Sequence, residues 1–363
     1  MSKYYVGLPV KHREYEIGVV KEVSDADDYL VVDFSGSEIK FSIDTVEKDR
    51  CLYILSDPPR PEPRDPNETG TTVETSTTAP PPPNSPDYLK LDLTNWIISA
   101  SGEPDIDSEY IRTKQIIFRY IEAGQYTIGS EATELGHNAD ETRRQITLDR
   151  PFYISIFPIT IGQFKRFQNE TDRGYKFAFS TRPATNISYT DLRGNNKGKN
   201  WPKAGHVVDK DSYIDILRRL CEDKLLFDLP TEAQWEIACR ARSNAAWGNG
   251  KDITDTKRCF NLDEIGVYRW NYAEEEGITA EVGSKNPNGW GIYDMHGNVY
   301  EWCLDWYVAN PAAFGTPATC GKYRVIRGGS YLSDASVCRS AWRGNAAPDE
   351  HHNNLGFRLV INL

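Results

Sequence analysis

The sequence predicts an α+β protein in which a small all-β module precedes a large domain with little regular secondary structure. Three observations support this fold class. Apolar and polar residues alternate in three short segments before residue 55, which is the period of half-buried strands. Two helix capping boxes and one further amphipathic segment lie within residues 88–363. The rest of that region consists of short apolar segments interrupted by Gly, Asn and Pro, and loops that long are usually functional.

The first module is predicted from its alternating segments. These are residues 17–23, 29–34 and 38–43. Turn-forming residues separate them, and the second turn, at 35–37, is short enough for a hairpin. Residues 1–55 therefore predict a small five-stranded SH3-like barrel. Such a barrel could bind a partner of its own, and a docking or oligomerisation appendage is an equally good interpretation.

Residues 56–87 differ in composition from both neighbouring regions. They read SDPPRPEPRDPNETGTTVETSTTAPPPPNSPD, with almost no apolar side chain to bury. Such a segment cannot offset the entropy lost on ordering, so we expect a flexible to extended linker with polyproline II character. The alternative is an ordered loop wrapped on the following domain. The third part, residues 88–363, is continuous and globular in composition.

Three helices are predicted in the large domain. Thr160 and Gln163 have the spacing of a capping box, as do Thr231 and Gln234, and a third helix is expected to start near Asp211. The apolar residues at helical spacing are Ile161, Phe164 and Phe167 in the first helix, Ile214, Leu217 and Cys221 in the helix near Asp211, and Trp235 and Ala238 in the remaining one.

Composition excludes several classes of function. The chain has 363 residues, with 53 acidic against 42 basic side chains and a net charge of -11. An acidic chain is a poor candidate for binding nucleic acid, which needs clustered Lys and Arg. The 9 Trp, 20 Tyr and 13 Phe, against 2 Met, predict many buried rings or an aromatic ligand pocket.

No apolar run is long enough to cross a membrane, and the first residues have no apolar core of a secretory signal. We therefore expect a cytoplasmic protein with no membrane partner. None of the seven cysteines forms a C-x-x-C pair, which disfavours zinc-ribbon and thioredoxin-type sites. In the cytoplasm, mostly reduced and buried thiols are expected.

Five segments then carry a family resemblance. They are FYI with ITIGQF in residues 152–164, LPTEAQWE in 229–236, NGWGIYDMHGNVYEWC in 288–303, RVIRGGS in 324–330 and LGFR in 355–358. In this order they resemble the formylglycine-generating enzyme (sulfatase-modifying factor) domain family, over roughly residues 115–363. The resemblance implies a variant of the C-type-lectin-like fold with a core rich in Trp and Arg. It places Trp235, Trp290 and Trp302 in that core, with Trp306 beside them.

The resemblance implies more than one function, because fold does not fix function. One branch of the family oxidises cysteine to formylglycine with copper(I) held by two cysteines, which follow RGGS with four residues between them. Here Cys338 matches the second cysteine, and Ser333 stands in place of the first. A serine hydroxyl is a poor ligand for a soft ion. We therefore predict a member of the non-oxidase branch, without copper.

The alternative is an enzyme: a sulfatase-maturing formylglycine-generating oxidase, or a related non-haem metal-dependent oxidase, in which Cys338 would act. The resemblance suggests Cys303 as the neighbour of Cys338, through either a thiol contact or a disulfide. A cytoplasmic location favours two reduced thiols.

Iron is not expected. Within residues 88–363, no histidine forms an H-x-D or H-x-E pair, which a facial triad would use. His296 lies within a family segment and is predicted to be structural. Adjacent residues in an extended loop point apart, so His351 and His352 are poor candidates for one ion.

Calcium is the metal that the resemblance suggests, as a structural ion. It prefers carboxylate, amide and carbonyl oxygens. Asn298 and Glu301 match the positions at which family members hold it, and Asn271 is a weaker candidate for a second site. The alternative is that Asn298 and Glu301 only hydrogen-bond the backbone of their turn.

The ligand surface is expected between RGGS and LGFR, because lectin-fold relatives bind with that segment. Its candidate residues are Tyr331, Ser333, Asp334, Ser336, Trp342, Arg343, Asn345, Asp349, His351 and His352. Trp, Tyr and Arg are enriched at binding hot spots, and rigid rings beside adaptable polar groups are typical of paratopes. We predict a protein or peptide ligand bound at residues 331–354, ahead of a carbohydrate. The alternative is that Arg339, Trp342 and Arg343 are core braces.

Overall fold

A computed structural model gives the fold of the chain. It describes the backbone of residues 9–12, 17–24, 29–34, 37–42 and 52–54, and all atoms of residues 85–167, 181–194, 208–272, 279–309 and 321–363. The chain divides into two compact units, Met1–Ser76 and Thr77–Leu363. The predicted linker lies largely outside the described residues, so its conformation stays a prediction.

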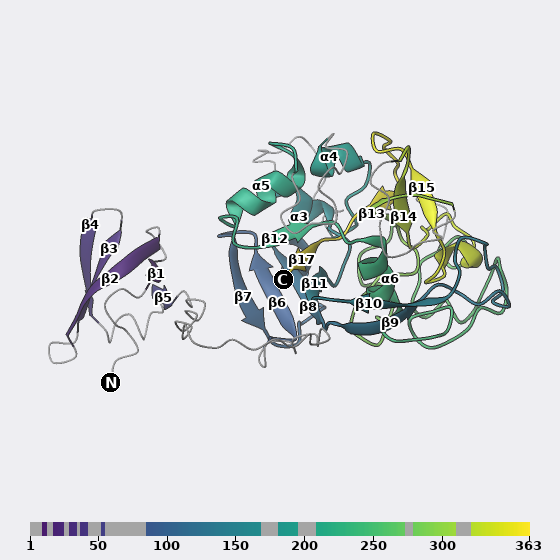
Figure 1. Ribbon diagram of the computed structural model, residues 1–363, viewed down its shortest axis with the longest axis horizontal. Helices are drawn as coiled ribbons and strands as arrows, with labels where there is room; N and C mark the ends of the chain where they lie inside the picture. Colours follow the sequence, from purple (N-terminus) through teal and green to yellow (C-terminus); the bar gives the residue numbers. More distant parts are fainter. Residues whose placement is uncertain are drawn as a thin grey trace, which may run out of the picture. The chain divides into compact units, whose positions relative to one another are not determined.

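The first unit contains one antiparallel sheet of five strands. They are β1 Pro9–His12, β2 Ile17–Ser24, β3 Tyr29–Phe34, β4 Ser37–Ser42 and β5 Leu52–Ile54. Their order in the sheet is β4-β3-β2-β1-β5 (Figure 1). The three strands predicted from alternation are β2, β3 and β4. Since β4 and β5 are at opposite edges, and the described residues show no pairing between them, closure into an SH3-like barrel stays a prediction.

The second unit is built on a sheet of six strands in the order β12-β17-β11-β8-β6-β7. The strands are β6 Tyr88–Asp92, β7 Ile97–Ser101, β8 Gln115–Ile121, β11 Phe152–Ser155, β12 Leu226–Asp228 and β17 Val360–Asn362. The central strands β8 and β11 are buried along most of their length, which explains why they read as continuous apolar runs rather than alternating ones.

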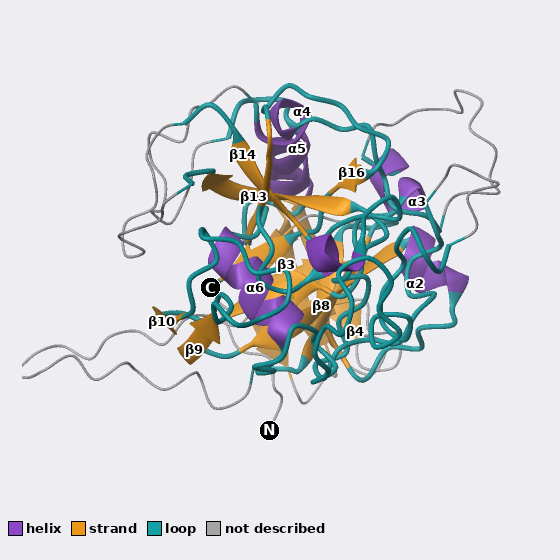
Figure 2. Ribbon diagram, turned by 90° about the vertical axis from the view of Figure 1, so that its right-hand side faces the viewer, coloured by secondary structure: helices purple, strands orange, loops and turns teal. Residues whose placement is uncertain are grey.

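A second sheet of four strands has the order β15-β14-β13-β16, and β9 and β10 form a separate hairpin (Figure 1). The strands of both are β9 Gly124–Ile128, β10 Arg144–Leu148, β13 Tyr300–Trp306, β14 Arg324–Arg327, β15 Gly344–Ala346 and β16 Leu355–Gly356. The family segments 288–303, 324–330 and 355–358 thus supply three neighbouring strands of one sheet. Loops fill much of the remainder (Figure 2).

The helices are short. They are α2 Glu109–Thr113, α3 Ile161–Lys165, α4 Tyr189–Arg193, α5 Tyr213–Leu220, α6 Glu232–Arg240 and the 3₁₀ helix η3 Ala335–Cys338. The predicted helices are confirmed as α3, α5 and α6. Both predicted capping boxes are present, at Thr160 with Gln163 and at Thr231 with Gln234. Helices α2 and α4 were not predicted.

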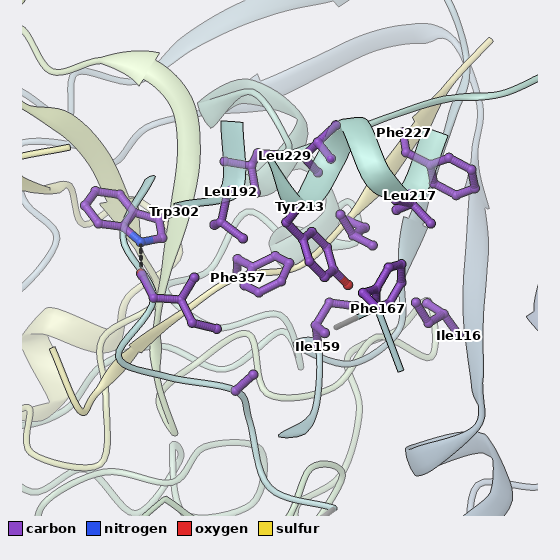
Figure 3. Packing of buried hydrophobic residues seen from close by; sticks show 14 of the residues in the cluster. Ile116, Ile159, Phe167, Leu192, Tyr213, Leu217, Phe227, Leu229, Trp302 and Phe357 are labelled. Carbon is purple, nitrogen blue, oxygen red and sulfur yellow. Dashed lines mark hydrogen bonds between the residues drawn. The ribbon is translucent and has the colours of Figure 1, made fainter. Parts of the chain in front are cut away.

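The largest core cluster lies between the six-stranded sheet and helices α3, α4 and α5. Tyr213 packs against Phe167, with ring centroids 4.4 Å apart, and against Phe357 at 5.2 Å. Trp302 is fully buried beside them and donates from Nε1 to the carbonyl of Ile187 at 2.9 Å (Figure 3). Aromatic pairs of this kind stabilise a core beyond the area they bury.

Three family segments meet at one buried carboxylate. Glu301 on β13 accepts from the indole Nε1 of Trp235 on α6 at 2.6 Å and from Arg358 at 2.6 and 2.7 Å. All three side chains are shielded from solvent. The segments LPTEAQWE, GNVYEW and LGFR are therefore joined by a charge-assisted contact, which holds α6 against the four-stranded sheet.

Candidate functional site

A groove of about 450 Å³ opens on the four-stranded sheet. Its lining residues are Tyr300, Ile326, Trp342, Arg343, Gly344, Asn345, Ala346, Glu350, His352, Asn354 and Leu355. Ligand pockets have volumes of about 300–1,000 Å³ and combine apolar walls with a few polar groups. The groove therefore has the size and composition of a ligand site, and most of its lining comes from the segment predicted to bind.

Two aromatic rings provide an aromatic surface in the groove. The rings of Tyr300 and Trp342 have centroids 5.7 Å apart and are inclined at 37°. Gly344 on β15 allows this arrangement, because a Cβ at that position would lie 2.4 Å from Trp342 Cη2 and 3.0 Å from Ile326 Cγ1. The indole of Trp342 thus lies across the glycine and remains partly exposed.

A hydroxyl cluster connects residue 333 to the groove. The hydroxyls of Ser333 and Tyr300 are hydrogen-bonded at 2.9 Å, and the Ser333 oxygen also accepts from the amide of Ser330 at 3.0 Å. The Ser330 hydroxyl in turn accepts from Asn354 Nδ2 at 3.1 Å. Burial raises the pKa of Tyr300, so its phenol stays protonated. The position that the resemblance assigns to a copper-binding cysteine therefore braces two residues of the groove, Tyr300 and Asn354.

The Arg343 guanidinium is engaged by the protein itself. It forms a bidentate pair with Glu232 on α6, at 2.6 and 2.9 Å. Glu232 also contacts Arg327 at 3.3 Å, and Arg327 bonds Glu236 at 2.6 Å. Arg343 therefore contributes a wall of the groove while its charge is neutralised within a buried lattice of alternating charges.

Glu350 and His352 form the outer polar part of the groove. His352 Nε2 lies 3.2 Å from Glu350 Oε2, which also accepts from the amide of Ala347 at 3.1 Å. These hydrogen bonds, from His352 first and Ala347 second, lower the pKa of Glu350. Both side chains are about half exposed, at 46% and 48%, so a ligand can reach them.

A ligand in solvent cannot reach the Cys338 thiol. It is fully buried at the end of η3, where a Cβ on Gly329 would lie 2.6 Å from its sulfur. Burial raises the pKa of the Cys338 thiol above its usual value, which opposes the thiolate that copper(I) requires. With the Ser333 hydroxyl committed to hydrogen bonds, the residues at these two positions do not fit a copper(I) site.

Cys303 is not the neighbour of Cys338. Both are free and buried, and they belong to different core clusters. Cys303 points from β13 toward the cluster that contains Trp235, whereas Cys338 packs with Trp247 and its neighbours. The resemblance could not show this, because the two cysteines lie on different elements that meet only through the tertiary fold.

The remaining ligand-surface candidates divide into two groups. Tyr331 is 5% exposed and packs in a small cluster with Val267 and Ala280. Asp334 accepts from the indole of Trp270 at 2.9 Å, and Ser336 is partly buried beside it in η3. These three residues come before Trp342 in the sequence and do not line the groove.

Asn345, Asp349 and His351 are exposed. Asn345 lines the groove, and His351 Nε2 lies 2.9 Å from Asp191 Oδ2 on α4. Asp349 precedes Glu350 but is not part of the lining. The structure therefore gathers Trp342, Arg343, Asn345 and His352 in one groove and leaves the other candidates around it.

The candidate calcium ligands are already engaged. Glu301 is held by Arg358 and Trp235, and Asn298 exchanges hydrogen bonds with the backbone of Ala280 at 3.0 and 3.2 Å. Asn271 bonds the backbone of Tyr268 and Gly266. Since these side-chain oxygens are satisfied within the protein, the arrangement does not fit a calcium ion. Among the described residues, no three His, Cys, Asp or Glu side chains are grouped to hold a metal.

His296 is buried and makes two structural hydrogen bonds. Its Nε2 accepts from the amide of Gly248 at 2.9 Å, and its Nδ1 lies 2.9 Å from the carbonyl of Cys338. Burial lowers the pKa of His296 to about 4. It is therefore a neutral ring that donates from Nδ1, as a core histidine would.

Sequence reasoning missed seven groove residues. They are Tyr300, Ile326, Gly344, Ala346, Glu350, Asn354 and Leu355. Glu350 and Asn354 lie within the segment that was predicted to bind. For Glu350, the available signal was its charge, next to the candidate Asp349. Tyr300 and Ile326 come from neighbouring strands and gave no signal, because their place depends on the pairing of β13 with β14 and β16.

The described part of the chain contains no helix with the length and apolar character needed to cross a bilayer. Residues 108–363 match the family described as sulfatase-modifying factor enzyme 1-like domain. The formylglycine-generating enzyme of Mus musculus is 30% identical over 279 residues, which are 66% of this chain and 73% of the mouse protein.

Two further comparisons concern the same family. The inactive C-alpha-formylglycine-generating enzyme 2 of Mus musculus is 26% identical over 301 residues, covering 74% of this chain and 91% of its own. The structure of PvdO from Pseudomonas aeruginosa superposes with a TM-score of 0.53 at 25% identity, over 68% of this chain and 94% of that one. The family match includes every residue that lines the groove.

Proposed function

Because this chain belongs to the family of sulfatase-modifying factor enzyme 1-like domains, we propose that it uses the groove on its four-stranded sheet to bind a peptide segment of a protein partner. The observation that carries this proposal is the position of Ser333. Its hydroxyl supports Tyr300 and, through Ser330, Asn354. At the position where the oxidase branch of the family has a copper-binding cysteine, this chain has a serine that helps to shape the groove.

The composition of the groove supports a peptide as ligand. Tyr300 and Trp342 offer rigid aromatic faces, and Asn345, Glu350 and Asn354 offer polar groups around them. Rings next to adaptable amides are the residue types that dominate recognition of proteins and peptides. Arg343 contributes shape rather than charge, since Glu232 neutralises it.

The rival proposal is a formylglycine-generating or related metal-dependent oxidase. It would need copper(I) between positions 333 and 338, where the chain offers a hydroxyl and a buried, protonated thiol. A family member whose name describes it as inactive is similar over most of its length, so loss of the oxidase activity is compatible with the fold. We therefore rank binding first.

The described cysteines are all free thiols, which favours a reducing compartment. We accordingly propose that binding takes place in the cytoplasm. A separate partner for residues 1–55 stays a prediction, because the side chains of that unit lie outside the described residues.

The proposal is tested by selecting ligands with the full chain. The chain is immobilised and challenged with a random peptide library, and the dissociation constants of enriched peptides are then measured in solution. Trp342→Ala should weaken binding by about tenfold or more, as expected for a hot-spot aromatic. The matched control is Trp270→Ala, which removes an exposed indole outside the groove.

Three outcomes would contradict the proposal. The first is that no peptide is enriched, and the second is that both tryptophan variants lose affinity equally. The third is oxygen uptake with a cysteine-bearing peptide and added copper(I) that disappears in Cys338→Ala, which would establish the oxidase instead. Melting temperatures of all variants show whether any loss reflects unfolding.

A further inference from the structure

The groove carries one carboxylate, Glu350, that pairs with no lysine or arginine side chain among the described residues. Arg343 and Glu350 are its two charged side chains besides the titratable His352. The Arg343 charge is cancelled by Glu232 in a bidentate pair. Within the described residues, the hydrogen-bond partners of Glu350 are the amide of Ala347 and the imidazole of His352. The groove therefore presents negative charge to a ligand.

The same carboxylate shares the groove with an aromatic surface. Tyr300 and Trp342 line it together with Glu350, and the indole is partly exposed. The faces of aromatic rings carry partial negative charge and attract ammonium and guanidinium groups, most strongly on tryptophan. A carboxylate next to such faces adds a charge-assisted hydrogen bond to the same cation.

We propose that the groove selects peptide segments that carry a lysine or arginine side chain, with the cation on the Trp342 and Tyr300 faces and paired with Glu350. This rests on the proposed peptide-binding function and specifies its ligand chemistry. The aliphatic stem of the side chain would contact Ile326 and Leu355, which form the apolar wall. An acidic ligand would meet Glu350 without a free cation in the groove, because Arg343 is already paired.

The buried ion pairs of Glu232 explain why Arg343 cannot turn to an acidic ligand instead. Glu232 binds Arg343 and Arg327 at once, so releasing Arg343 toward a ligand anion would leave a buried carboxylate only partly compensated. That exchange is costly in the interior. Glu350 is at the surface and can turn from His352 to a ligand cation at little cost.

The experiment uses the full chain and four peptide pools. The pools are identical random hexamers except for one fixed central residue, which is lysine, arginine, norleucine or glutamate. Norleucine has the stem of lysine without its charge. Capture of the lysine and arginine pools should exceed that of the norleucine pool by about tenfold, and the glutamate pool should be the weakest.

Two carboxylate variants locate the effect. Glu350→Gln should remove most of the difference between the lysine and norleucine pools, whereas Asp349→Asn, an exposed carboxylate outside the lining, should preserve it. Trp342→Ala should lower capture of both cationic pools. Because Glu350 and Asp349 are exposed, neither substitution is expected to prevent folding, and melting temperatures check this.

The outcomes separate this inference from the proposed function. Capture of peptides without regard to charge, preference for glutamate, or an unchanged preference in Glu350→Gln would overturn the inference and leave peptide binding intact. Failure to capture any pool would overturn both. A parallel set of neutral oligosaccharides is tested in the same format, and binding of these alone would assign the groove to carbohydrate.

Discussion

Arg358 and Glu301 form a bidentate ion pair in the interior of the second unit. Nε of Arg358 lies 2.6 Å from Oε2, and Nη2 lies 2.7 Å from Oε1. Both side chains are completely shielded from solvent. Trp235 on α6 donates to the same carboxylate, and Arg358 also donates to the carbonyl of Ser155 on β11, so this contact joins α6 and both sheets.

Removing the charge of Glu301 should therefore destabilise the fold. Glu301→Gln leaves Arg358 buried without its counter-ion, and the free energy of unfolding should fall by about 3–5 kcal/mol. Urea denaturation measures this. The control is Glu264→Gln, which breaks the exposed pair with Lys251 and should cost less than about 1 kcal/mol. Equal effects for both variants would show that the buried pair is not a bracing contact.

Ser333→Ala tests the hydroxyl cluster below the groove. The substitution leaves the amide of Ser330 and the Tyr300 hydroxyl without their partner, which should lower stability by about 1–3 kcal/mol. Affinity for groove ligands should fall as well, because Tyr300 loses its fixed position. If affinity is unchanged while stability falls, Ser333 supports the core but not the groove.

Gly344→Ala tests whether the groove depends on the position of Trp342. The added methyl group would overlap the indole, so the ring must move and ligand binding should weaken. Overpacking of this kind costs about 1–3 kcal/mol in stability. Gly102→Ala is the control, since no atom lies within 4 Å of its added carbon. Unchanged binding in Gly344→Ala would exclude the proposed aromatic surface.

Asp294 should make stability depend on pH. Burial raises the pKa of its carboxyl from 3.8 to about 6, although the amide of Gly283 donates to it. Between these values the native chain holds a proton that the unfolded chain has lost. The free energy of unfolding should therefore fall as pH rises, by about 1.4 kcal/mol per unit. Asp294→Asn should flatten that slope, as followed by urea denaturation at a series of pH values.

Cys338 should be inert in the native protein. Its thiol is buried and its pKa is raised by that burial, so the reactive thiolate is scarce. Iodoacetamide should label Cys338 only after denaturation, as measured by peptide mass spectrometry. Rapid labelling in the native state would indicate an accessible, activated thiol and would favour the oxidase.

Local sequence signals predicted helices α3, α5 and α6 but missed α2 and α4. The capping boxes at Thr160 and Thr231 depend on residues three positions apart, so they can be read without the fold. The strands of the second unit were harder to predict. Strands β8 and β11 are buried on both faces, which removes the alternation that marks a half-exposed strand.

The candidate site was predicted in part for a similar reason. Trp342, Asn345 and His352 do lie in the groove, but Tyr331 is packed in a core cluster and Tyr300 was missed. Aromatic residues serve cores and binding surfaces equally well. Only the neighbours of a ring distinguish these roles, and those neighbours come from other strands.

The sequence by itself determined the family, the start of the main helices and the serine at position 333, because each depends on residue identity or short spacing. The tertiary structure decided which charges are free to act. Arg343 pairs with the carboxylate of Glu232, 111 positions away. In the described chain, the Glu350 carboxylate is hydrogen-bonded only by its near neighbours Ala347 and His352. A charge is neutralised by what lies within a few ångströms of it, and in this fold distant segments supply those partners.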